Sequence, residues 1–206
     1  MLQRQPTREA IVQAALRCVA GGDWEGTSLQ TVRQRAGVSN GSLFHHFRTR
    51  QDLTAAVIAA ALEEHQRVLL EELSADAASG VAGVVRRHLR WVHDNQAVAR
   101  LLLSAAPDVL RSSMSEPVLE ANRRFFEAVA EWLREHGWQT RPELGVVLAL
   151  WIGPAQEYSR QWLAAPGKPA PTTAADDLAL GAWTALAPLL HQAGNGENTA
   201  TEGARQ

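Results

Sequence analysis

The chain has 206 residues, 46% of them apolar and 20% charged, an ordinary balance for a folded globular protein that excludes a mainly disordered one. The single cysteine, Cys18, excludes an internal disulfide and is expected in the core. The start of the chain carries arginines and no signal-peptide core, and no apolar run is long enough for a bilayer, so we expect a cytoplasmic protein without a membrane partner.

The charge is divided between two regions of the chain. The formal net charge of −2 taken alone argues against nucleic-acid binding. Residues 1–50, however, contain seven arginines and three acidic residues, a net charge of +4. The other 13 basic and 19 acidic residues give residues 51–206 a net charge of −6. This division predicts two parts with different partners.

Apolar residues recur at three- and four-residue steps, which predicts an all-α fold of about nine helices. We expect a first helical domain over 1–52, a second helical domain over 53–192 and a disordered tail over 193–206. The predicted helices, in chain order, are 7–20, 27–36, 39–47, 49–73, 80–95, 96–105, 115–137, 140–164 and 173–192.

Helix start and stop signals support these boundaries. Thr7 and Ser39 are expected N-caps, and capping boxes are expected to begin at Thr27, Thr49 and Thr140. Glycine ends the second helix at Gly37, because a left-handed C-cap favours that residue. The Gly153-Pro154 pair and Pro188 should bend the last two long helices.

The second and third predicted helices form a helix-turn-helix around Gly37. Short polar residues over 39–42 crowd the start of the third helix. A recognition helix presents its N-terminal residues to base edges in the major groove, where small side chains allow close approach, and its N-terminus attracts phosphate. This arrangement favours contact with double-stranded DNA.

Residues 27–53, which read TSLQTVRQRAGVSNGSLFHHFRTRQDL, closely resemble the DNA-binding segment of TetR-type (TetR/AcrR) transcriptional regulators. The resemblance covers about the first 55 residues. It implies a homodimer that binds a palindromic operator, usually as a repressor relieved by a small molecule. Carried over by position, it implies a DNA-binding set of Thr27, Ser28, Gln30, Ser39, Asn40, Gly41, Ser42, Phe44, His46 and Arg50.

Some of these positions have two interpretations or depart from the family pattern. Gln30 serves either as the capping partner of Thr27 or as a DNA contact, and Asn40 could pair with adenine. Phe44 replaces the commoner tyrosine and so loses a hydroxyl group. Arg33 replaces a small alanine, and we expect its stem along the helix pair with the guanidinium turned outward.

Aromatic residues in the second half predict a ligand cavity. His88 and Asn122 interrupt apolar helix faces, so each is either a core residue with a hydrogen-bond partner or a polar anchor in an apolar cavity. The predicted effector is a small apolar or aromatic molecule, with no cofactor and no metal. The candidate lining is His88, Trp91, Asn122, Phe125, Trp132, Trp151 and Tyr158.

The segments Leu144–Ala155 and Leu178–Leu190 are apolar on nearly every side. Such helices must be covered on both sides, either by a second copy of the chain or within an internal hairpin. A four-helix interface between two chains is also what the family resemblance implies. The candidate interface residues are Leu148, Ala155, Trp183, Leu186 and Leu190.

Together these patterns predict a ligand-responsive transcriptional repressor that acts as a homodimer on a palindromic operator. The alternative is a helical interaction or carrier protein whose DNA binding is lost. A helical enzyme using His88 or Glu157 finds no support, because the sequence shows no nucleophile with base spacing, no metal pair on one face and no phosphate loop.

Overall fold

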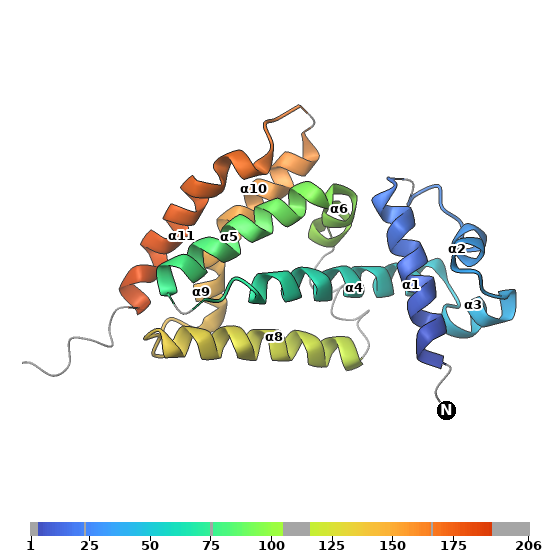
Figure 1. Ribbon diagram of the computed structural model, residues 1–206, viewed down its shortest axis with the longest axis horizontal. Coiled ribbons are helices and arrows are strands. Elements are labelled where there is room, and N and C mark those ends of the chain that lie inside the picture. Colours follow the sequence, from blue (N-terminus) through green and yellow to red (C-terminus); the bar gives the residue numbers. More distant parts are fainter. Residues whose placement is uncertain (1–3, 23, 75, 105–115, 166, 191–206) are drawn as a thin grey trace, which may run out of the picture.

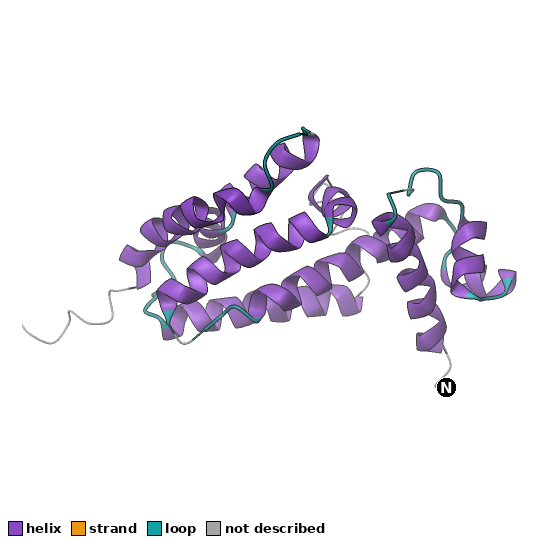
Figure 2. Ribbon diagram, turned by 45° about the horizontal axis from the view of Figure 1, so that its top comes forward, coloured by secondary structure: helices purple, strands orange, loops and turns teal. Residues whose placement is uncertain are grey.

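The computed structural model describes residues 4–22, 24–74, 76–104, 116–165 and 167–190. These residues form ten α-helices and one short 3₁₀ turn, with no strand among them (Figure 2), which confirms the all-α prediction. The predicted tail over 193–206 lies outside the described residues. The elements are α1 Arg4–Ala20, α2 Leu29–Ala36, α3 Asn40–His46, α4 Arg50–Leu70, α5 Ala77–Asp94, α6 Gln96–Ser104, α8 Glu116–Glu135, α9 Leu144–Trp151, α10 Gly153–Ala164, η1 Pro171–Ala174 and α11 Ala175–Leu190.

The helices form an elongated molecule with α1, α2 and α3 grouped at one end (Figure 1). Helix α4 runs from this group into the rest of the molecule and packs against α5, α6 and α8. Helices α5 and α11 form the most extensive helix pair, and α9 and α10 complete that side. No helix in the described residues combines the length and the apolar character that crossing a bilayer requires.

Two apolar cores share α4. The first joins α1, α2 and α3 to the N-terminal half of α4, with Cys18 and Leu53 almost fully buried in it. This core continues past α4 and also includes Trp91, Leu102 and Leu163. The second core lies among α5, α8, α9 and α11 and includes Leu69 of α4. Packing therefore crosses the predicted boundary at residue 52 without a linker.

Three of the predicted helix signals are confirmed. Gly37 adopts the left-handed conformation (φ 67°) as the C-cap of α2. The Ser39 hydroxyl accepts a hydrogen bond from the backbone N–H of Ser42 at 3.1 Å and caps α3. Thr49 and Asp52 form a complete capping box at the start of α4. These local signals place the helix-turn-helix and the following long helix as expected.

Three other predicted caps were wrong. Helix α1 begins at Arg4, so Thr7 lies inside it. Ser28, and not Thr27, caps α2 by accepting from the backbone N–H of Thr31 at 3.1 Å, because Thr27 is buried with 4% of its surface exposed. Thr140 has a left-handed backbone (φ 62°), and Glu143 precedes α9 without a side-chain cap.

The C-terminal helices differ from the predicted ones in their interruptions. The long helix expected over 140–164 is broken at Ile152 into α9 and α10, directly before Gly153 and Pro154, which confirms a bend at that pair. Helix α11 begins at Ala175 after the 3₁₀ turn and continues through Pro188 to Leu190. Helix α4 ends at Leu70, three residues before the predicted end.

Candidate nucleic-acid interface and ligand cavity

Helices α2 and α3 form a helix-turn-helix whose second helix presents its start to solvent. Ser39, Asn40 and Gly41 are exposed there, and Ser42 is partly exposed. Leu43 and Phe47, on the other side of α3, are buried in the first core and fix the orientation of the helix. Phe44 is exposed, with 47% of its surface accessible, and presents an aromatic ring without the hydroxyl group that a tyrosine would add.

The remaining candidates for DNA contact surround this helix start. Ser28 and Gln30, at the beginning of α2, are exposed, and His46 is partly exposed with its ring 5.1 Å from that of His45. Thr27 is the exception, because its burial leaves almost no surface for a contact. The other candidates thus share the accessible surface of one unit.

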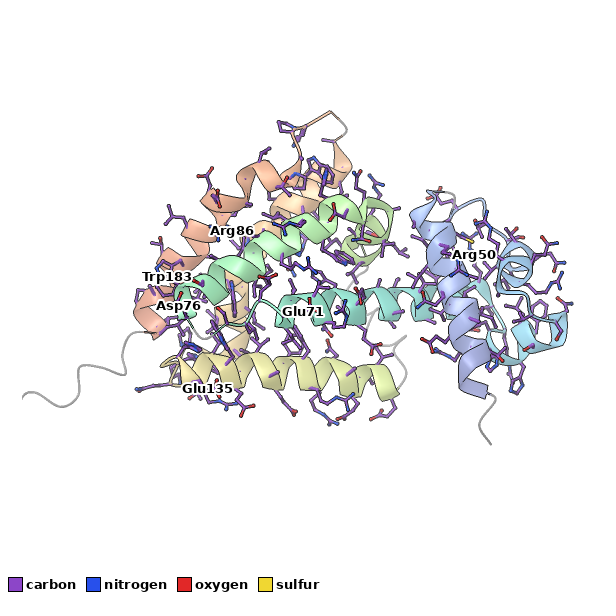
Figure 3. All side chains as sticks on the ribbon, in the orientation of Figure 1. Arg50, Glu71, Asp76, Arg86, Glu135 and Trp183 are labelled. Carbon is purple, nitrogen blue, oxygen red and sulfur yellow. The ribbon has the colours of Figure 1, made fainter. Side chains whose placement is uncertain are left out.

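Arg50 is exposed but already has partners within the chain. Its guanidinium donates to the backbone oxygen of Glu25 at 3.0 Å and to that of Trp24, and it lies 5.2 Å from the centre of the Trp24 ring. Figure 3 shows Arg50 in the helix-turn-helix end of the molecule, far from Trp183 of α11. The side chain joins the segment before α2 to the start of α4 and keeps a positive charge at the surface.

The outward guanidinium expected for Arg33 was wrong. The Arg33 Nε donates to Gln30 Oε1 at 3.1 Å, and its Nη1 donates to the backbone oxygen of Val38 at 3.3 Å. The side chain thus connects α2 to the turn before α3. Gln30 consequently pairs with Arg33 and not with Thr27, and its amide N–H groups remain available as donors.

A cavity of about 590 Å³ lies between α4, α8 and α9, with Val84 of α5 at its wall. Of the predicted lining residues, Asn122, Phe125 and Trp151 line it. The lining predicted from the sequence was wrong for His88, Trp91, Trp132 and Tyr158. His88 is fully buried, Trp91 belongs to the first core, and Trp132 stacks on Trp151 while its indole N–H donates to the Ser74 backbone oxygen.

Helix α4 contributes the part of the cavity that the sequence analysis missed. Glu64 lies outside this lining, is exposed and pairs with Arg67. A stripe of mainly apolar residues, at three- and four-residue steps, carries the signal that could have found the lining. Its members are Leu62, His65, Gln66, Leu69, Leu70 and Leu73.

A buried hydrogen-bond chain behind the cavity joins α4, α5 and α10. Ser159 Oγ donates to the Ala155 backbone oxygen at 2.7 Å, so it accepts from His88 Nε2 at 3.2 Å. His88 Nδ1 is then unprotonated and accepts from His65 Nε2 at 3.0 Å. His88 therefore has the partners of a core polar residue, which was one of the two predicted interpretations.

Both histidines are neutral at neutral pH. Burial lowers the pKa of His65 to about 4. Burial, together with the neighbouring His65, lowers the pKa of His88 to about 3. Protonation of either ring would place a charge among apolar side chains. It would also turn an accepting ring nitrogen into a donor and so disrupt the hydrogen bonds between His65, His88 and Ser159.

The candidate interface residues on α9, α10 and α11 divide into two groups. Ala155, Leu186 and Leu190 are buried in the second core of the chain itself, so they leave almost no surface for a partner. Leu148 and Trp183 are partly buried. The exposed apolar surface of α9 and α11 is instead formed by Val146, Leu150 and Leu180, with 48%, 42% and 65% of their surfaces accessible.

Residues 11–57 match the family described as bacterial regulatory proteins, tetR family. A curated relative, the HTH-type transcriptional repressor AcnR of Corynebacterium glutamicum, is 33% identical over 51 residues, which are 25% of this chain and 27% of that protein. AcnR of Corynebacterium diphtheriae is 34% identical over 50 residues, 24% of this chain and 26% of that protein. The matched segment spans only about a quarter of either relative.

Solved structures match over most of the chain. The transcriptional regulator FadR of Bacillus subtilis, solved in complex with stearoyl-CoA, has a TM-score of 0.63 at 15% identity and covers 84% of this chain and 96% of its own. A TetR-family regulator of Streptomyces coelicolor has a TM-score of 0.63 at 18% identity, with 89% and 83% covered. The helix-turn-helix segment, residues 11–57, thus matches the tetR family of bacterial regulatory proteins, and the chain as a whole has the fold of these solved structures.

Proposed function

We propose that the protein is a ligand-responsive transcriptional repressor that binds a palindromic operator as a homodimer. The observation that carries the proposal is the exposed polar start of α3, where Ser39, Asn40 and Gly41 face solvent on a rigid helix-turn-helix. A helix start of this composition fits the major groove. The AcnR relatives, which match about a quarter of this chain, are named transcriptional repressors, and the proposed repressor role follows that name.

Asn40 is proposed as the base reader and the surrounding groups as phosphate contacts. An asparagine amide pairs with adenine through two hydrogen bonds, whereas hydroxyl groups, backbone N–H groups and arginines bind phosphate. The net charge of +4 over residues 1–50 doubles in a dimer and attracts the DNA backbone, while the acidic remainder repels it. DNA is thereby restricted to the helix-turn-helix surface.

The DNA contact is tested by a mobility shift on the region upstream of the protein's own gene. Asn40→Ala should lower the preference for this DNA over a scrambled duplex by about tenfold, because a two-bonded base contact contributes about 1–3 kcal/mol of discrimination. Gln161→Ala, on the exposed side of α10, is the matched control. A wild-type chain without any sequence preference would contradict the proposal and favour the carrier protein that has lost DNA binding.

The regulatory part is proposed to work through two shapes of the dimer. One holds the two recognition helices about 34–36 Å apart, one turn of DNA, and the other does not. A ligand releases the operator only if it binds the second shape more tightly. Helix α4 lines the cavity and also packs in the core of the helix-turn-helix, so it is the proposed connection. The cavity is the proposed ligand site, which the stearoyl-CoA complex of one structural neighbour supports.

A further inference from the structure

The cavity between α4, α8 and α9 contains an amide pair, Gln66 and Asn122, in a mainly apolar wall that also includes His65 and Gln156. We propose that it binds an uncharged ligand with an extended apolar part and one neutral group, an amide or a hydroxyl, that the side chains of Gln66 and Asn122 recognise. This inference rests on the ligand-responsive function proposed above and names the chemical class of the ligand.

The side-chain amides of Gln66 and Asn122 are hydrogen-bonded to each other, which leaves one acceptor and one donor available to a ligand. Gln66 Nε2 donates to Asn122 Oδ1 at 2.7 Å, which joins α4 to α8. Gln66 is only 7% exposed, yet its Oε1 makes no hydrogen bond within the described residues, and neither does Asn122 Nδ2. Both atoms keep accessible surface, so a ligand that displaces water from them and supplies both partners gains affinity over one that leaves them unpaired. An amide or a hydroxyl supplies one donor and one acceptor.

The surroundings of this pair favour a neutral ligand. The side chain next to it, His65, is uncharged at neutral pH because burial holds its pKa at about 4. The described lining residues include no aspartate, glutamate, lysine or arginine. A carboxylate or a phosphate placed here would lose its hydration without gaining a counter-charge from these residues.

The apolar part of the cavity wall determines the chemistry and the size of the rest of the ligand. Leu62, Leu69, Phe125, Leu148 and Ile152 line the cavity from three helices. Its volume of about 590 Å³ lies within the range of small-molecule sites. The cavity therefore fits a ligand with an alkyl or aromatic body.

The test compares probes that differ in one group. Straight-chain primary amides, primary alcohols, carboxylates and acyl-CoA esters of eight, ten and twelve carbons are titrated into the full chain by calorimetry near neutral pH. We expect the best amide or alcohol to bind at least about tenfold more tightly than the carboxylate and the acyl-CoA of the same length, since one satisfied hydrogen bond is worth about that factor.

A double variant locates the preference. Gln66→Leu with Asn122→Leu removes both partners together, so no buried group is left unpaired and the melting temperature should be kept. The tenfold preference for the amide should disappear, while the weak binding of the carboxylate stays unchanged. Glu127→Gln, on the exposed side of α8, should keep the preference.

Three results would overturn the inference: a carboxylate or acyl-CoA that binds as tightly as the amide, a double variant that keeps the preference, or no binding of any probe. The titrations are made without DNA. Loss of operator binding in the mobility shift would therefore contradict the proposed function and leave the ligand result standing.

Discussion

At the scale of single residues, the buried pair His65 and His88 links stability to pH. Both rings are neutral in the fold because burial lowers their pKa values to about 4 and about 3, whereas an unfolded histidine has its ordinary pKa near 6.5. The unfolded state therefore binds more protons between these values. The contribution of the neutral pair to the free energy of unfolding is fully present above about pH 6.5 and decreases as the pH falls toward 4.

The free energy of unfolding should drop by about 1.4 kcal/mol per pH unit for each histidine that titrates only in the unfolded state. Urea unfolding monitored by tryptophan fluorescence at several pH values measures this slope. His65→Leu with His88→Leu should flatten it, and His45→Gln, an exposed histidine on α3, should not. An equal slope in the double variant would show that other groups cause the pH dependence.

Single residues also mark where sequence reasoning succeeds and where it stops. Gly37, Ser39 and Thr49 were predicted correctly because a cap depends on residues within one turn. One of the two interpretations of Gln30 paired it with Thr27, whereas Arg33 bonds to Gln30 and also to the turn at Val38. The cavity wall was only partly predicted, because it depends on the angle at which α4 meets α8, which periodicity within one helix does not specify.

At the scale of elements, the contact between α5 and α8 depends on a glycine. A Cβ atom at Gly80 would lie 2.5 Å from Cζ2 of Trp132. The indole cannot easily move, because its N–H donates to the Ser74 backbone oxygen at 2.8 Å and its ring stacks on Trp151 at 5.6 Å. The Trp132 indole can lie this close to the backbone of α5 only with glycine at this position.

Gly80→Ala should therefore lower the free energy of unfolding by about 1–3 kcal/mol, the usual cost of overpacking a core. Gly145→Ala is the matched comparison, because a Cβ there meets nothing within 4 Å in α9. That variant should raise stability by about 0.5–1 kcal/mol through the lower backbone entropy of alanine in a helix. Chemical denaturation of both variants measures the difference, and equal effects would contradict the close contact.

At the scale of the whole molecule, the exposed apolar surface of α9 and α11 supports the proposed dimer. Val146, Leu150 and Leu180 remain accessible although the two helices pack together. Burial of one leucine side chain contributes about 1.5–3 kcal/mol. A charge in its place would be buried in the proposed interface without a counter-charge.

Leu180→Glu should therefore weaken the dimer by at least about tenfold, measured as a concentration-dependent shift to monomer in analytical ultracentrifugation. Ala164→Glu adds the same charge to an exposed position of α10 and should leave the dimer unchanged. A Leu180→Glu chain that stays dimeric would mean that the two copies meet on another surface.

The core that begins among α1, α2 and α3 and continues to Trp91, Leu102 and Leu163 has a consequence for domain exchange. A chimaera joined at residue 52 would cut through packed side chains and would remove the apolar residues that α4, α5 and α6 contribute to the core of the helix-turn-helix. A junction after α6 would keep α1 to α6 together, so that Leu163 of α10 would be the one buried residue of that core from the other parent. Exchange of the proposed ligand site therefore means that α8 and α9, together with α10 and α11, are replaced around a retained α4.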